Sequence, residues 1–107
     1  MILIYTTCES LDQAKKISKH LLHEKLCACT NIIPAMHSLY LWPPKSNIIE
    51  EGNEVILIIK TVKKHFKNIE KEIRSLHSYE TPAIFSLPVQ EVSKKYFDWL
   101  SGEVSPQ

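Results

Sequence analysis

Two apolar runs constrain the fold of this chain more than any other feature. One is Ile2-Leu3-Ile4-Tyr5, and the other is Val55-Ile56-Leu57-Ile58-Ile59. Both are short and rich in β-branched residues, which is typical of strands. Neither run alternates with polar residues, and a strand that is apolar on both sides needs cover on both sides. The sequence therefore predicts a sheet whose two faces are both buried where these strands lie.

The first half of the chain predicts a strand, a helix and a bent second strand. A strand over residues 2–7 is followed by Ser10-Leu11-Asp12-Gln13, which fits a capping box at a helix start. Extended segments over 28–33 and 37–42 are interrupted by Pro34, which cannot donate to a ladder. We expect one long strand with a bend or bulge at the proline. The apolar stripe of the helix is Leu11, Ala14, Ile17, Leu21 and Leu22.

The second half begins with the strongest strand pattern, over residues 54–61. The two prolines in the segment Trp42–Asn47 cannot pair in a sheet, so this segment is a loop and the two strands form an extended hairpin. A second helix is expected from near Val62, with its apolar stripe at Phe66, Ile69, Ile73 and Leu76.

A fourth strand and a short helix complete the pattern. The strand is expected over 83–89, and Pro88 favours an edge or a strand end. Ser93 can cap the last helix, and residues 102–107 are expected to form a loose tail. The order βαββαβ is that of an α+β, ferredoxin-like sandwich, here one domain over residues 1–107. Right-handed crossovers place both main helices on one face of the sheet.

The other face of the sheet then lacks cover within the chain. Another copy of the chain would hide it, so we predict a homo-oligomer. The alternative is that the short C-terminal helix folds under the sheet. We favour the oligomer because one short helix hides too little area.

Composition excludes several classes of protein. The charge is balanced, with 13 Lys+Arg against 12 Asp+Glu, which argues against a nucleic-acid binder. A chain of 107 residues can bury a core without metal or disulfide bonds, so no cofactor is expected for folding. The three cysteines, Cys8, Cys27 and Cys29, are expected to be reduced thiols of a cytoplasmic protein. No apolar run has the length of a membrane span.

The segment His77-Ser78-Tyr79-Glu80-Thr81-Pro82 gathers the most chemistry. It lies between the second helix and the fourth strand and holds an imidazole, a phenol and a carboxylate within four positions. A His and a Glu this close can share a proton, hold a metal or bind a ligand. A structural role is equally open for His77, because its cationic form would gain from the end of the helix dipole.

Several segments together resemble the CutA family, the divalent-cation tolerance proteins. They are Thr6-Thr7-Cys8, residues 24–34, Ser38-Leu39-Tyr40-Leu41-Trp42, Ile59-Lys60-Thr61, residues 77–82, Leu87-Pro88-Val89 and Tyr96-Phe97-Asp98-Trp99-Leu100. The resemblance implies a ferredoxin-like subunit, a tight homotrimer and a role in tolerance of copper and other divalent metals. It also implies a likeness to the PII nitrogen-signalling proteins. No enzymatic reaction comes with the family, so we do not expect an enzyme.

The chain departs from the family pattern at two places. Trp42-Pro43-Pro44-Lys45 stands where the family has Trp-x-Gly-Lys, which alters the hairpin tip. Ser78 stands where the family has proline. Without that proline the preceding residue is free to be helical, so we expect the second helix to run slightly longer.

We predict that the chain binds a divalent metal, copper before others. His77 is the best candidate ligand, and Glu80, Cys29 and Cys8 are weaker ones. Packing is the alternative role for the cysteines, which are common as small core residues. Cys27 is two residues from Cys29, but this spacing alone is a weak metal motif.

A PII-like signalling or scaffold trimer is the alternative function. Its inter-subunit cleft would bind a small anionic ligand or a protein partner. Lys60, Tyr79, Glu80 and Trp42 would be the residues of this cleft, and Lys45 in the hairpin loop would face the partner. The sequence does not identify that partner.

Overall fold

The computed structural model describes residues 1–106 and confirms the ferredoxin-like order. The elements are β1 (Ile2–Cys8), α1 (Leu11–His23), β2 (Cys29–Leu41), β3 (Ile49–Thr61), a 3-10 turn (Lys63–His65), α2 (Phe66–Leu76), β4 (Ile84–Pro88) and α3 (Lys94–Glu103). The sheet is antiparallel with the strand order β2-β3-β1-β4. β4 is therefore an edge strand, as Pro88 at its end predicts.

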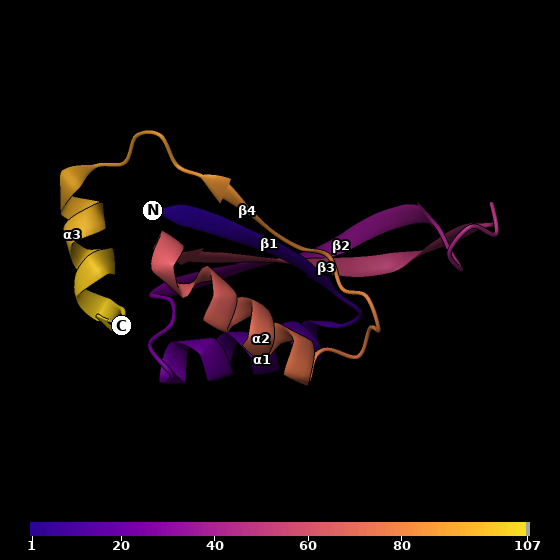
Figure 1. Ribbon diagram of the computed structural model, residues 1–107, viewed down its shortest axis with the longest axis horizontal. Coiled ribbons are helices and arrows are strands. Elements are labelled where there is room, and N and C mark those ends of the chain that lie inside the picture. Colours follow the sequence, from indigo (N-terminus) through magenta and orange to yellow (C-terminus); the bar gives the residue numbers. More distant parts are fainter. Residues whose placement is uncertain (107) are drawn as a thin grey trace.

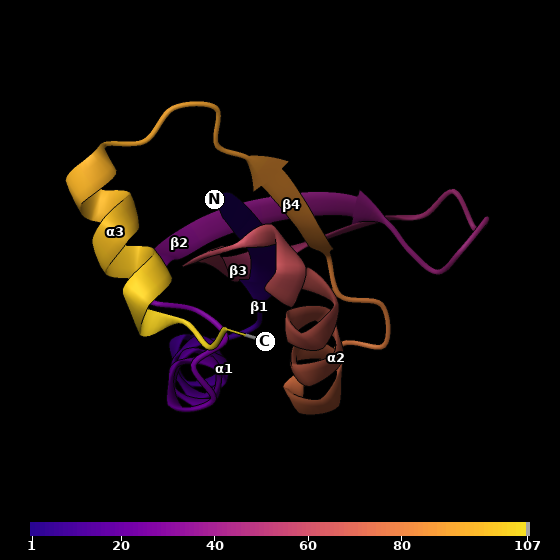
Figure 2. The ribbon, with the colours of Figure 1, turned by 60° about the vertical axis from the view of Figure 1, so that its left-hand side comes forward.

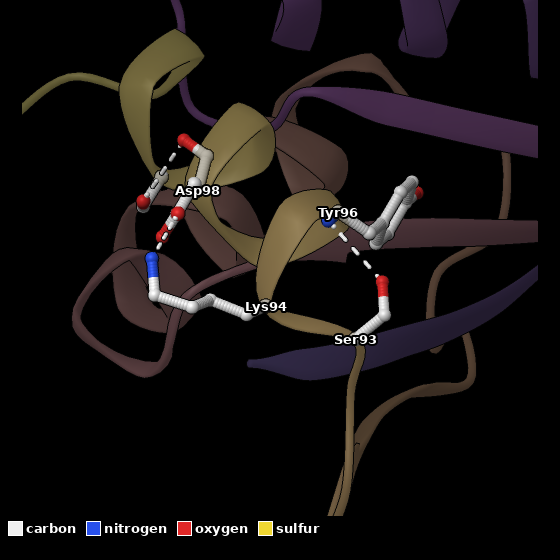
Figure 3. Close-up of polar contacts among 5 residues, drawn as sticks. Ser93, Lys94, Tyr96 and Asp98 are labelled. Atoms are coloured by element: carbon white, nitrogen blue, oxygen red, sulfur yellow. Dashed lines mark hydrogen bonds and ion pairs between the residues drawn. The ribbon is translucent and has the colours of Figure 1, made fainter.

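The helix starts follow the local sequence. The Ser10 hydroxyl accepts a hydrogen bond from the Gln13 backbone at 3.1 Å. The Gln13 side chain reaches back to the Glu9 N–H at 3.3 Å, one residue before the cap. At α3 the Ser93 hydroxyl accepts from the Tyr96 backbone at 3.2 Å (Figure 3). These caps satisfy amides that have no partner within their helices.

The hairpin of β2 and β3 is longer than expected. β3 begins at Ile49, five residues before the predicted start at Glu54, because pairing continues outward until Leu41 faces Ile49. The hairpin projects from the body at the end opposite α3 (Figure 1). The predicted bulge is present, since the register shifts between Ile33 and Met36. The sequence alone missed the outer part of β3 because residues 50–53 have no apolar side chain to mark a strand, and the one apolar residue of this part, Ile49, is exposed.

One face of the sheet is covered by α1 and α2 (Figures 1 and 2). Alternate residues of β1 and β3 point into this layer, and Ile4, Leu57 and Ile59 have no exposed surface. They pack with residues such as Ile17 of α1 and Ile69 of α2. This is the core that the helical stripes predict.

The opposite face, here called the open face, has no helix layer over it. It carries the other set of alternate residues, including Leu3, Tyr5, Ile56, Ile58, Phe85 and Leu87. Phe85 and Leu87 are 46% and 50% exposed. α3 stands at one end of the sheet and not beneath it (Figures 1 and 2). Within the described chain, the C-terminal helix therefore does not provide the cover that the alternative required.

The C-terminal segment is more ordered than we expected. A loose tail over residues 102–107 was predicted, but α3 continues to Glu103 and the side chain of Val104 is buried. The Ser105 backbone N–H donates to the Lys25 carbonyl at 2.7 Å. A buried valine and a backbone bond fix this segment as far as the structure describes it. The last residue lies outside the described part.

Candidate functional site

The predicted site begins where α2 ends. We expected α2 to run past Leu76, but it stops there and His77 is extended, with φ −82° and ψ 144°. The His77 ring explains this. Its Nε2 donates to the Thr7 carbonyl at 2.7 Å, and its Nδ1 accepts from the Tyr79 N–H at 3.0 Å. The expectation of a longer helix was wrong because these two bonds require His77 to leave it.

Both ring nitrogens of His77 are thus used by the backbone. One nitrogen donates and the other accepts, which is the pattern of a neutral imidazole. β4 pairs with β1 only as far as Thr6, so the Thr7 carbonyl lies beyond that ladder and the ring satisfies it. To bind a metal, His77 would have to give up one of its two bonds. The His77 ring therefore links the end of β1 to the segment after α2 through these two hydrogen bonds.

Tyr79 is held by a carboxylate. Its hydroxyl donates to Glu54 Oε2 at 2.8 Å, and its ring lies 4.6 Å from the His77 ring, centroid to centroid. Burial raises the pKa of the Tyr79 phenol, and the bond to Glu54 and the charge of Glu9 raise it further. The phenol is therefore a hydrogen-bond donor throughout the physiological pH range.

A pocket of about 600 Å³ adjoins this pair of residues. It lies against the open face between the segment after α2 and the hairpin, and it is lined by residues of β1, β2 and β3 as well. Among its lining side chains are Tyr5, Tyr40, Trp42, Tyr79, Glu54 and Glu80. Its volume is within the range of ordinary small-molecule sites.

Three of the four residues predicted for a cleft are brought together in this pocket, and Lys60 is not. Trp42, Tyr79 and Glu80 line it. Lys60 is six residues along β3 from Glu54, roughly 20 Å away in an extended strand. Its Nζ instead lies 5.8 Å from the centroid of the Tyr96 ring, at the α3 end of the sheet.

The four predicted metal ligands do not form one cluster. Cys8 is fully buried at the end of β1, and burial, with the charges of Glu54 and Glu9, raises the pKa of its thiol to about 11. Cys29 is half-buried at the start of β2, and its thiol donates to the Thr30 carbonyl at 3.8 Å. Glu80 is exposed.

Cys8 and Cys29 are also distant from each other in the sheet. Cys8 faces Val55 on β3, whereas Cys29 faces Lys60. Within residues 1–106, no three side chains among His, Cys, Asp and Glu are placed to hold a metal ion together. A metal bound by one copy of the chain would require rearrangement of these side chains.

Sequence reasoning missed Glu54, the acceptor for Tyr79, as well as Tyr5 and Tyr40 in the pocket wall. A signal for Glu54 was available. It occupies the same face of β3 as Ile56 and Ile58, and it interrupts that apolar face with a carboxylate. The two tyrosines carried no such signal, because aromatic residues on strands are common in cores and interfaces.

The comparisons with known proteins agree with the fold and extend it. The family model described as "CutA1 divalent ion tolerance protein" matches residues 2–103. The chain belongs to the CutA1 family.

Among its CutA1 relatives, a divalent-cation tolerance protein CutA from Archaeoglobus fulgidus is 39% identical over 101 residues, which are 94% of this chain and 95% of the relative. A solved structure of the Thermus thermophilus divalent cation tolerance protein has a TM-score of 0.92 and 33% identity. It covers 98% of this chain and 100% of its own. A structure of CutA from Archaeoglobus fulgidus, described as periplasmic, has a TM-score of 0.92 and 37% identity, covering 98% of this chain and all of its own.

These names concern tolerance of divalent cations and not a reaction. They place the chain in a family that is named for tolerance of divalent cations. They name neither a particular metal nor a ligand residue. No helix among the described residues is long and apolar enough to cross a membrane.

Proposed function

We propose that this chain is a cytoplasmic, homotrimeric divalent-cation tolerance protein that binds divalent metal, copper before others, and catalyses no reaction. The observation that carries the proposal is the open face of the sheet in a member of the CutA1 family. The fold supports an assembly because this face has no cover within the described chain, while the metal role follows from the names of the relatives.

The open face supports association through its area and its composition. Its strands present Tyr5, Ile58 and Phe85 beside one another, and Ile33 adds a side chain that is 45% exposed. Apolar patches of this kind on a soluble protein mark contact surfaces. Copies of the same chain are the simplest partners, since most soluble oligomers are homo-oligomers.

Assembly also offers a way to complete a metal site. One copy supplies isolated donors, and copies that meet at the open face would bring donors of different chains together. Cys29 is a soft donor near this face, and Glu80 is an exposed hard donor. Both are available to a metal, because the thiol of Cys29 would give up only its bond to the neighbouring Thr30 carbonyl. His77 and Cys8 remain proposed ligands, but His77 would lose a backbone bond and Cys8 would have to lose its burial.

Sedimentation of a charged variant tests the assembly. Leu87→Glu places a carboxylate on the open face, and Leu22→Glu places one on α1, where the leucine is 39% exposed. We expect wild type and Leu22→Glu to sediment as trimers at micromolar concentration and Leu87→Glu to dissociate while keeping its circular dichroism. A compact wild-type monomer under these conditions would refute the assembly.

A copper(II) titration against a competing chelator, in buffer without a reductant, tests the ligands. We expect Cys29→Ser and Glu80→Gln to weaken binding, and His77→Gln to weaken it less. His23→Gln is the control, because His23 is exposed on α1. Equal affinity in all of these variants would remove the predicted ligands from the site.

The alternative of an anion-binding, PII-like cleft has less support. The pocket beside Tyr79 is lined by two carboxylates, Glu54 and Glu80, and Lys60 lies at the other end of β3. A negative lining repels anions, so an anionic ligand would need positive groups from another copy.

A further inference from the structure

The balanced net charge of the chain hides a separation of charge in space. Residues 11–25 and 63–76 comprise α1, the two residues after it, the 3-10 turn and α2, and are called the helix layer from here on. They hold nine of the 13 Lys and Arg residues and four of the 12 Asp and Glu residues. The net charge of the helix layer is therefore +5, and the rest of the chain carries −4. All nine cations are exposed.

Six of these cations form two stripes, Lys67, Lys71 and Arg74 on α2 and Lys15, Lys16 and Lys19 on α1. Within each stripe the spacings of three and four residues put the cations on one face of their helix. The α2 stripe extends over about 10 Å of helix. The Debye length at physiological ionic strength is about 8 Å, so the charges within a stripe act together on a bound anion.

The carboxylates that lie nearest to the α2 stripe do not cancel it. Glu72 is paired with His20 of α1, with Nε2 and Oε1 2.6 Å apart, so its charge lies between the two helices. Glu70 lies 3.7 Å from Lys67 Nζ and 3.7 Å from Arg74 Nε. Pairs of this length at the protein surface contribute little, and a bound anion can replace them.

Each stripe also contains a cation without a partner. Within residues 1–106, neither Lys19 nor Lys71 forms an ion pair. Their neighbours one turn earlier, Lys15 and Lys67, are cations as well. Like charges at this spacing repel each other, so a bound carboxylate would relieve repulsion as well as form new pairs.

The side chains of the helix layer favour an acidic protein segment over a nucleic acid or a lipid surface. Phe66 is the one aromatic residue of these two segments, and it packs against the core, so no ring is offered to a base. Four carboxylates are interspersed among the cations, which opposes a continuous row of phosphates. The exposed large apolar side chains are Leu11 and Leu22 of α1, which is less apolar surface than a membrane-binding helix presents.

The geometry of two packed helices favours an extended segment. Packed helices lie about 8–10 Å apart, which separates the two stripes by a similar distance. Successive side chains of an extended chain point to opposite sides. A run of carboxylates along the helix pair therefore reaches both stripes at once.

We propose that the helix layer is a docking surface for an extended, Asp/Glu-rich segment of a protein partner, which lies along α1 and α2 with carboxylates over both stripes. The helices cover the side of the sheet opposite to the open face (Figures 1 and 2). The surface is therefore accessible in a single chain and in an assembly of chains that meet at the open face. This inference rests neither on metal binding nor on the number of copies.

Fluorescence anisotropy of a labelled octaglutamate peptide tests the proposal, and octaglutamine with the same label is the matched neutral control. We expect octaglutamate to bind at least about tenfold more tightly, because the two peptides differ in charge and hardly in shape. The affinity should fall as NaCl is raised from about 0.1 M to about 0.5 M. Equal affinities for the two peptides, or an affinity for octaglutamate that salt does not change, would refute recognition by charge.

Charge-reversal variants locate the surface. Lys19→Glu and Lys71→Glu each place a carboxylate beside cations of the same stripe, which does not oppose the helix. We expect each to weaken octaglutamate binding, and the double variant to weaken it by about tenfold or more. The control is the double variant Lys45→Glu and Lys95→Glu, which has the same net charge but changes exposed lysines outside the helix layer. It should bind nearly as wild type does.

Three outcomes would overturn the assignment. Equal loss of binding in the two double variants would show that net charge and not the helix layer is recognised. Weakening by one of the two single variants alone would refute the placement over both stripes. Tighter binding of phosphatidylserine vesicles or of a short DNA duplex than of octaglutamate would refute the class of partner. Sedimentation of the Lys19→Glu, Lys71→Glu variant should match wild type, which keeps this inference separate from the assembly.

Discussion

His77 gives the sharpest prediction, because its structural role and its role as a metal ligand lead to different results. Replacing it by alanine removes the bond from Nε2 to the Thr7 carbonyl and the bond from the Tyr79 N–H to Nδ1. A typical hydrogen bond contributes about 0.5–1.5 kcal/mol net, and a buried group left without a partner costs about 1–3 kcal/mol. Thr7 is 7% exposed, so water does not readily replace the ring at its carbonyl.

These contributions add to about 1.5–4.5 kcal/mol of lost stability for His77→Ala. In a domain of this size 1 kcal/mol corresponds to roughly 4–8 °C in Tm, so the expected loss is roughly 6–36 °C. Urea unfolding followed by circular dichroism measures the free energy, with all proteins at one concentration because oligomers are stabilised by mass action.

Two further variants make the result specific. His77→Gln keeps an amide donor for the Thr7 carbonyl, so we expect it to lose about half as much stability as His77→Ala. His23→Ala changes an exposed histidine of α1 and should remain within about 0.5 kcal/mol of wild type. A loss of stability below about 0.5 kcal/mol in His77→Ala would refute the structural role of the His77 ring. Unchanged stability with a large loss of copper affinity would favour the ligand role instead.

Three more outcomes are expected. The pKa of Tyr79 is raised in the folded chain, so its stabilising effect is present below the unfolded value of about 10 and is lost as the pH rises above it. The free energy of unfolding of Tyr79→Phe, measured in urea, should therefore fall less than that of wild type between neutral pH and strongly alkaline pH. Hydrogen bonds that the His37 ring donates to Glu51 and Asn53 raise the pKa of His37. An NMR titration should therefore give a midpoint above the usual 6.5, and this midpoint should fall in Glu51→Gln. Burial raises the pKa of the Cys27 thiol to about 12, so iodoacetamide should leave it unmodified in the native protein and modify it in urea; rapid modification of the native thiol would contradict its burial.

The periodic features of the fold were predictable from the sequence. Residues such as Ile4, Ile17 and Ile69 are spaced by the periods of strand and helix, and these periods record which side faces the core. The caps at Ser10 and Ser93 were predictable for a similar reason, because a cap joins residues two or three positions apart. Local spacing carried this information without any knowledge of the tertiary structure.

The candidate site was predicted only in part. The segment from His77 to Glu80 was identified by its chemistry, but its partners Thr7 and Glu54 are 70 and 25 residues away from the residues they contact. One sequence without relatives gives no signal for such distant pairs. The end of α2 was mispredicted for the same reason, since a bond to β1 outweighed the local freedom that Ser78 allowed.

The sequence by itself determined the order of the elements, the buried face of each and the surplus of apolar strand surface that calls for a further layer. Hydrophobic periodicity is enough for this, because it is written in neighbouring positions. Only the tertiary structure decided that the His77 ring bonds β1 to the segment after α2, that Lys60 and Tyr79 lie apart, and that an aromatic, acidic pocket forms beside the hairpin. Those outcomes depend on the register of β1 against β3 and on where β4 stops pairing, and register is a property of the assembled sheet.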